Sequence, residues 1–91
     1  MTRRYLITGR VQGVGFRWFV EREAQAIGVG GWVRNNDEGA VEVMASGSAE
    51  QLTRLRKMLE QGPRASRVDE VQEFEVESQQ HETSFRIEGA W

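Results

Sequence analysis

The stretch RRYLITGRVQGVGFRWFVEREAQAIG, residues 3–28, contains two different hydrophobic periods joined by a glycine-rich loop. Residues 3–8 form a short strand pattern, with Tyr5 and Ile7 on one face and Leu6 on the other. Residues 16–27 repeat apolar side chains at helical spacing, and Gly28 is a natural helix end. The stretch therefore predicts a strand, a loop at 9–15 and a helix.

The sequence after Gly28 continues with strand patterns and one more helix. Ser48 and Gln51 are spaced as a capping box, which marks a helix start. The turn residues NNDEG join two strand patterns and predict a hairpin. The expected elements are a strand at 29–34, a turn at 35–39, a strand at 40–45, a helix from Ser48 to Gly62-Pro63, and strands at 68–76 and 84–87.

The order strand, helix, strand, strand, helix, strand is that of the split βαβ, ferredoxin-like folds. We therefore expect an α+β protein of βαββαβ order, with an antiparallel sheet and two helices on one of its faces. In the strand at 68–76 we expect the apolar residues to face inward and the glutamates outward, with Val68, Phe74 and Val76 opposed to Glu70, Glu73 and Glu75.

Composition narrows the function classes. The 91 residues suit a single domain, 1–91, and the chain has no cysteine and one histidine, His81. Disulfides, thiolate metal sites and cysteine nucleophiles are thereby excluded, as are sites with several histidines, so no metal is expected. The sequence shows neither a long apolar run nor a signal peptide, which favours a cytoplasmic protein with no membrane partner.

The net charge of −2 argues against nucleic-acid binding, and its distribution is uneven. Residues 1–34 hold six arginines and two glutamates, a net +4, whereas residues 35–91 hold six basic and twelve acidic residues, a net −6. The positive half is thus the one that carries the glycine-rich loop. Solvated surface arginines explain most of this charge equally well.

The loop at 9–15 leads into a helix N-terminus, where backbone N–H groups lack partners and the helix dipole favours anions. Glycines allow the backbone to approach an anion closely. Arg17 stands in the first helical turn, where a cation is unfavourable unless an anion compensates it. The pattern indicates a phosphate site; the alternative is a tight strand-to-helix connection with no ligand.

Asn35 ends the second strand pattern, in GWVRNNDEG. Turn chemistry alone accounts for Asn35 and Asn36. The sequence by itself does not place Asn35 beside Arg17. Trp18 and Trp32 are interpreted as core or edge packing.

GRVQGVGFR, GWVRN and GAVEV, in this order and context, resemble the acylphosphatase family over nearly the whole chain. The resemblance implies a ferredoxin-like fold and hydrolysis of the carboxyl–phosphate bond of acyl phosphates without metal or cofactor. It implies that Arg17 binds phosphate and that Asn35 orients the attacking water. The loop that would bind phosphate with Arg17 consists of Gly9, Arg10, Val11, Gln12, Gly13, Val14 and Gly15.

The end of the chain departs from the family pattern, because Ile87 is followed by Glu88-Gly89-Ala90-Trp91. Any support of the site by a C-terminal arginine or carboxylate is therefore in doubt. The two motifs themselves are intact.

The chemistry implied by the resemblance suits so small a set of residues. An acyl phosphate releases a carboxylate, which needs no general acid, so positioning and charge are sufficient. The expected partners are a small-molecule acyl phosphate and the product inorganic phosphate, for a monomeric enzyme. The identity of the acyl group stays open.

Two other readings of the chain are an RNA-recognition module and a related domain without independent activity, as in carbamoyl-transfer maturation proteins. The first is disfavoured because residues 40–44 offer no aromatic side chain for base stacking.

Overall fold

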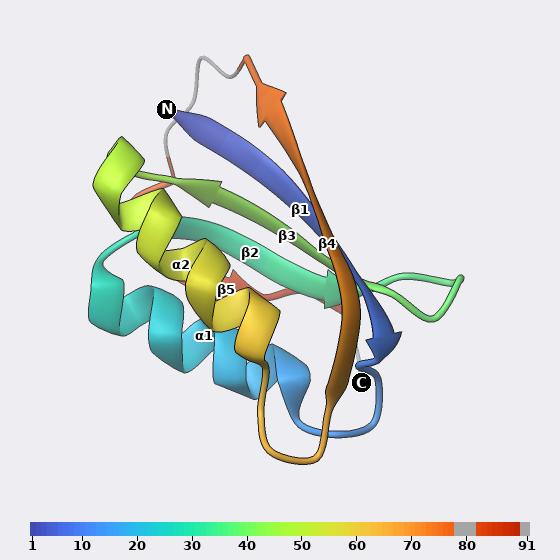
Figure 1. Cartoon of the computed structure of the whole chain (residues 1–91). Helices are drawn as coiled ribbons and strands as arrows, with labels where there is room; N and C mark the ends of the chain where they lie inside the picture. The colour runs from blue at the N-terminus through green and yellow to red at the C-terminus, as the bar shows by residue number, and fades with distance from the viewer. Residues whose placement is uncertain (78–81, 90–91) are drawn as a thin grey trace.

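The computed structural model describes residues 1–77 and 82–89. The elements in these residues are β1 (Thr2–Arg10), α1 (Phe16–Ile27), β2 (Gly30–Asn35), β3 (Val41–Ser46), α2 (Ala49–Gln61), β4 (Arg67–Val76) and β5 (Phe85–Ile87). The five strands form one sheet in the order β4-β1-β3-β2-β5, and all pairs are antiparallel except β2 with β5. The helices α1 and α2 lie side by side on one face of that sheet (Figure 1). The expected α+β, βαββαβ fold is confirmed.

The two helices begin in different ways. The predicted capping box of α2 is present: the Gln51 backbone N–H donates to Ser48 Oγ (3.1 Å), and the Ser48 N–H donates to Gln51 Oε1 (2.9 Å). In contrast, α1 follows Gly15, and no side chain caps its first turn. The N–H groups at the start of α1 therefore remain open for another acceptor.

A single cluster of buried apolar side chains lies between the sheet and the helices. Full burial of a valine, leucine or phenylalanine contributes about 1.5–3 kcal/mol each. Phe16 belongs to this cluster and is 2% exposed, which anchors the first turn of α1 next to Arg17. The largest fully buried members are Tyr5, Ile7, Val11, Phe16, Val20, Val33, Val41, Val43, Leu52, Leu55 and Leu59.

The expected faces of β4 are wrong from Glu73 to Val76. A β-bulge between Thr8 and Gly9 shifts the pairing of β1 with β4. As a result Val68 and Val71, three residues apart, both pack against the core. Glu73 therefore falls on the helix side, whereas Phe74 turns away from it and is 43% exposed. This bulge interrupts the regular alternation of inward and outward side chains that the sequence predicts for β4.

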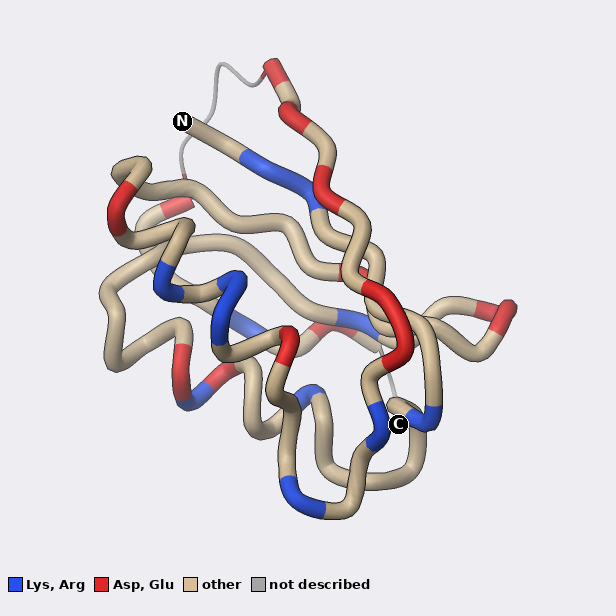
Figure 2. The backbone as a smooth tube through the Cα atoms, viewed as in Figure 1, with Lys and Arg blue, Asp and Glu red and all other residues tan. Residues whose placement is uncertain are grey.

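The acidic second half of the chain pairs with the basic first half across β1 and β4 (Figure 2). Glu73 forms ion pairs with Arg3 of β1 (3.4 Å) and with Arg56 of α2 (3.0 Å). The uneven charge along the sequence is thus partly balanced where the halves meet.

Glu42 lies on the sheet face without helices, and its side chain is only 9% exposed. It accepts hydrogen bonds from the guanidinium groups of Arg4 and Arg34, the latter at 2.8 Å. Burial by itself would raise the pKa of Glu42, but the hydrogen bonds from the two arginines outweigh it, and the pKa is lowered. Arg34 in turn covers the ring of Trp32 at 4.9 Å.

Candidate active site

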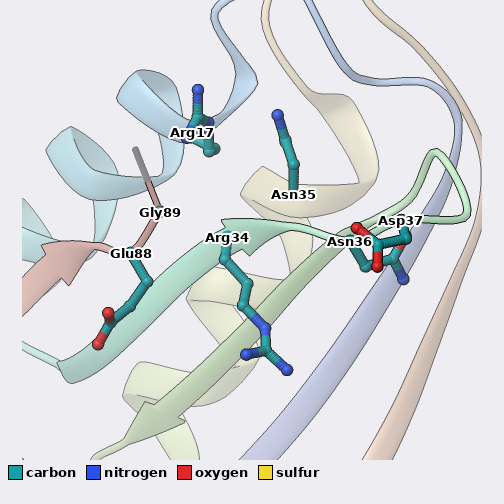
Figure 3. Close-up of a pocket in the computed structure, with 7 residues that line it drawn as sticks. All are labelled: Arg17, Arg34, Asn35, Asn36, Asp37, Glu88 and Gly89. Atoms are coloured by element: carbon teal, nitrogen blue, oxygen red, sulfur yellow. The ribbon is translucent and has the colours of Figure 1, made fainter. Parts of the chain in front are cut away.

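The sheet order brings Asn35 to the loop that precedes α1. Ile7 of β1 pairs with Val41 of β3, and Val41 pairs with Asn35 at the end of β2. These three residues share one row across the sheet, on the side that the helices cover. Asn35 therefore faces the N-terminus of α1, and the side chains of Arg17 and Asn35 lie on the same side of β2 (Figure 3).

The loop before α1 depends on two glycines with left-handed backbone angles. Gly13 has a φ of 74° and Gly15 a φ of 79°, values that other residues rarely adopt. An added Cβ would meet nothing within 4 Å at either position. The backbone there is thus bare on the side that faces away from the core.

Two hollows meet at Arg17 and Asn35. The smaller, of about 160 Å³, is lined by Val11, Gly13, Gly15, Phe16, Arg17, Trp18 and Asn35. The larger, of about 380 Å³, also has Arg17 and Asn35 in its lining (Figure 3). Its lining consists of Arg17, Arg34, Asn35, Asn36, Asp37, Glu88 and Gly89. The smaller hollow is therefore the place where glycine backbone, a guanidinium and an amide converge.

Asn35 and Asn36 differ although both stand at the start of the turn. The side-chain Oδ1 of Asn36 accepts hydrogen bonds from the N–H groups of Glu38 and Ala40, each at 2.9 Å. The Oδ1 of Asn35 is buried, and no donor among residues 1–77 and 82–89 reaches it. Turn chemistry thus explains Asn36 but not Asn35, and a buried oxygen without a partner needs another explanation.

The other predicted residues of the loop at 9–15 are placed as follows. Gly9 and Arg10 belong to β1, where they pair with Val68 and Arg67 of β4, and they do not line the smaller hollow. Val11 is buried in the core, and Val14 packs against it. Contact of their backbone with phosphate stays a prediction.

Gln12 has a side-chain role that the sequence did not reveal. Its Nε2 donates to the backbone carbonyls of Asn36 and Ala40, each at 2.9 Å. These carbonyls belong to the turn that follows Asn35. Gln12 therefore ties the loop before α1 to the end of β2. No sequence signal marks such a contact, because carbonyl acceptors occur at every residue.

The interpretation of Trp18 as packing is wrong, because its side chain is 75% exposed. Phe16 and Phe19 take the packing positions instead, with their rings in an edge arrangement at 6.1 Å. Trp32 is half-buried on the helix-free face of the sheet, beneath Arg34.

The C-terminal segment reaches the site at Gly89. A Cβ built on Gly89 would lie 3.8 Å from the Arg17 guanidinium. Glu88 continues the pairing of β5, since its N–H donates to the Val33 carbonyl at 2.8 Å. Ala90, Trp91 and the sequence's single histidine, His81, lie outside the described residues.

The chain is thus a small α+β protein with a candidate anion site at one end of its sheet. The candidate site is an uncapped helix start behind a glycine loop, with an arginine and an asparagine whose Oδ1 has no partner among the described residues. The family model for acylphosphatase matches residues 3–87. The chain belongs to the acylphosphatase family.

Individual relatives agree with that assignment. An acylphosphatase of Koribacter versatilis is 58% identical over 99% of this chain and 82% of its own length. The crystal structure of the Bacillus subtilis acylphosphatase superposes with a TM-score of 0.93 at 36% identity, covering 97% of this chain and 98% of that one. Full-length HypF in its phosphate- and nucleotide-bound form matches with a TM-score of 0.83 at 37% identity, over 97% of this chain and 12% of that one.

The function of this chain is accordingly that of its family, the hydrolysis of acyl phosphates, with a small-molecule acyl phosphate as substrate. None of the helices in residues 1–77 and 82–89 is long and apolar enough to cross a membrane.

Proposed function

We propose that the smaller hollow is the catalytic site, in which Arg17 and the loop before α1 hold the phosphoryl group and Asn35 holds the attacking water. The observation that carries this proposal is the convergence of Arg17, Asn35 and the bare backbone at Gly13 and Gly15 on one hollow. The guanidinium would bind two phosphoryl oxygens with its planar fork. The N–H groups at the uncapped start of α1 would bind a further oxygen.

The reaction needs no metal and no cofactor in this scheme. The water oxygen bonds to phosphorus as the bond between phosphorus and the acyl oxygen breaks, and the acyl group leaves as a carboxylate. A carboxylate is a stable anion at neutral pH, so no general acid has to protonate it. The proton of the water passes to a phosphoryl oxygen, since neither arginine nor asparagine accepts it. The products are the carboxylate and inorganic phosphate.

Arg17 and Asn35 have separable tasks. An arginine that stabilises the charge of a phosphoryl-transfer transition state contributes about 10³–10⁵ in rate. We expect Arg17→Ala to abolish hydrolysis of acetyl and benzoyl phosphate while the fold persists, because Arg17 follows the buried Phe16 but is itself only half-buried. Asn35→Ala should lower kcat and largely preserve KM, because water placement and not phosphate affinity is lost.

Purified variants and a phosphate-release assay test this proposal, with circular dichroism to verify folding. Turnover retained in Arg17→Ala would contradict the role of the guanidinium. For Asn35→Ala, a raised KM with normal kcat would contradict water placement. Wild-type activity should survive excess EDTA, and dependence on an added divalent ion would refute the metal-free scheme.

The same proposal includes four finer points. Residues 1–91 would act as one domain and as a monomer, in the cytoplasm and without nucleic-acid or membrane partners. A single cooperative unfolding transition tests the one domain, light scattering of the purified chain tests the monomer, and fractionation of cells tests the location and the absence of membrane partners. A panel of acyl phosphates against a phosphate monoester tests the substrate class, and equal turnover of the monoester would contradict it.

A further inference from the structure

Trp18 has no task in the catalytic scheme above, and it does not support the core. Its side chain is 75% exposed although it directly follows Arg17 in the first turn of α1. Single exposed apolar residues are common on protein surfaces and need no explanation in general. The position of Trp18 relative to the site sets it apart.

Trp18 lines two neighbouring hollows. It lines the smaller hollow together with Gly13, Arg17 and Asn35. It also lines a neighbouring hollow of about 300 Å³, whose other walls are Gly15, Phe19, Glu21, Arg22, Gln25 and Pro63. Both hollows share Gly15 and Trp18. A molecule bound in the smaller hollow and extending outward past α1 would therefore lie against the indole.

The direction in which the acyl group leaves follows from the in-line course of phosphoryl transfer. The attacking water and the leaving oxygen stand on opposite sides of phosphorus. Asn35, at the end of β2, lines one side of the smaller hollow. If the attacking water binds to Asn35, the acyl group lies on the opposite side of phosphorus, toward α1. On that side Trp18 is the large exposed apolar side chain among the lining residues.

We propose that Trp18 determines substrate specificity by binding the acyl group of the substrate on its indole face, so that aromatic acyl phosphates are preferred over acetyl phosphate. This inference rests on the proposed phosphate site. An aromatic ring fits the neighbouring hollow, because a cavity of about 150 Å³ already accepts benzene. Aromatic rings attract each other in offset or edge arrangements beyond the area that they bury. Acetyl phosphate has too small an acyl group to gain from this contact.

The test compares benzoyl phosphate with acetyl phosphate in Trp18→Ala and Trp18→Phe. In Trp18→Ala we expect KM for benzoyl phosphate to rise about three- to tenfold, the range of one aromatic contact, so that the preference for benzoyl over acetyl phosphate in kcat/KM falls by the same factor. Trp18→Phe should restore most of the preference. Phe74→Ala is the matched control, since it removes another exposed aromatic side chain on the helix-free face of the sheet.

Binding without turnover provides a second readout. Benzoylphosphonate and acetylphosphonate cannot be hydrolysed at the phosphorus–carbon bond, and their inhibition constants report the acyl contact directly. Trp18→Ala should weaken benzoylphosphonate only. An unchanged ratio of benzoyl to acetyl constants in Trp18→Ala would overturn the inference while leaving the proposed site intact. Arg17→Ala should abolish hydrolysis of both benzoyl and acetyl phosphate, which tests the proposed site. Trp18→Ala should retain hydrolysis of both substrates, so the two proposals can fail separately.

Discussion

Replacement of Gln12 by alanine removes the tie between the loop before α1 and the turn after β2. The wild-type side chain donates to the carbonyls of Asn36 and Ala40 at 2.9 Å each, in a partly buried position. A net hydrogen bond contributes about 0.5–1.5 kcal/mol, so loss of both lowers the free energy of unfolding by about 1–3 kcal/mol. In a domain of this size, each kcal/mol lowers Tm by about 4–8 °C.

The same change should also lower kcat, even under conditions where the variant is fully folded. Arg17 follows the loop and Asn35 precedes the turn, so we expect Gln12 to fix the relative position of these two proposed catalytic side chains. A misplacement of about 1 Å can cost about a hundredfold in rate. We expect Gln12→Ala to lower kcat for acetyl phosphate by about ten- to a hundredfold at a temperature where the variant is fully folded.

Thermal unfolding and steady-state kinetics measure the two effects, and Gln51→Ala is the matched control. Gln51 also makes side-chain hydrogen bonds, to the Ser48 N–H at 2.9 Å and to the Ile27 carbonyl at 3.2 Å, but at the opposite end of α1. Its loss should lower Tm by a similar amount and leave kcat unchanged. If Gln12→Ala shows only the loss of Tm, as Gln51→Ala does, the reasoning about register is refuted.

Three further changes test other parts of the structure. Gly15→Ala imposes the left-handed φ of 79° on a residue with a Cβ, which should cost about 1 kcal/mol in unfolding experiments and raise KM for acyl phosphates. Leu55→Ala, at a fully buried position of α2, should lower the free energy of unfolding by about 2–5 kcal/mol in urea titrations, and a loss below 1 kcal/mol would contradict the described core. The lowered pKa of Glu42 stabilises the fold above the carboxyl's unfolded value, near 4.5, and this contribution is lost as pH falls through the lower folded value. Wild-type Tm should therefore drop more steeply than that of Glu42→Gln below pH ~4.5, and parallel pH profiles would count against the buried ion pairs.

Those parts of the fold that depend on local chemistry could be predicted from the sequence. The capping box of Ser48 and Gln51 and the apolar repeat of α1 act within one or two helical turns, and both are present as expected. The faces of β4 could not be predicted correctly, because Thr8 pairs with Glu70 and Gly9 with Val68, which leaves Asp69 as an extra residue of β4 opposite β1. Bulges depend on pairing between segments far apart in the chain.

The residues of the candidate site also differ in whether they could be predicted from neighbouring residues in the sequence. The unusual place of Arg17 at an uncapped helix start is visible in the sequence, since it depends on adjacent residues. Asn35 and Asn36 are indistinguishable there, because either suits a turn. The structure separates them: the side chain of Asn36 is consumed by the turn, whereas the pairing of Asn35 with Val41 directs its amide toward the loop.

The position of β3 between β1 and β2 also orders events during synthesis of the chain. Arg17 and Asn35 are both translated before Val41, yet the row that aligns them runs from Ile7 through Val41 to Asn35. A nascent chain that ends before β3 has no central strand to set the spacing of β1 and β2. Arg17 and Asn35 therefore leave the ribosome before the strand that aligns them, and β3 must pair with both β1 and β2 before the proposed site residues come together.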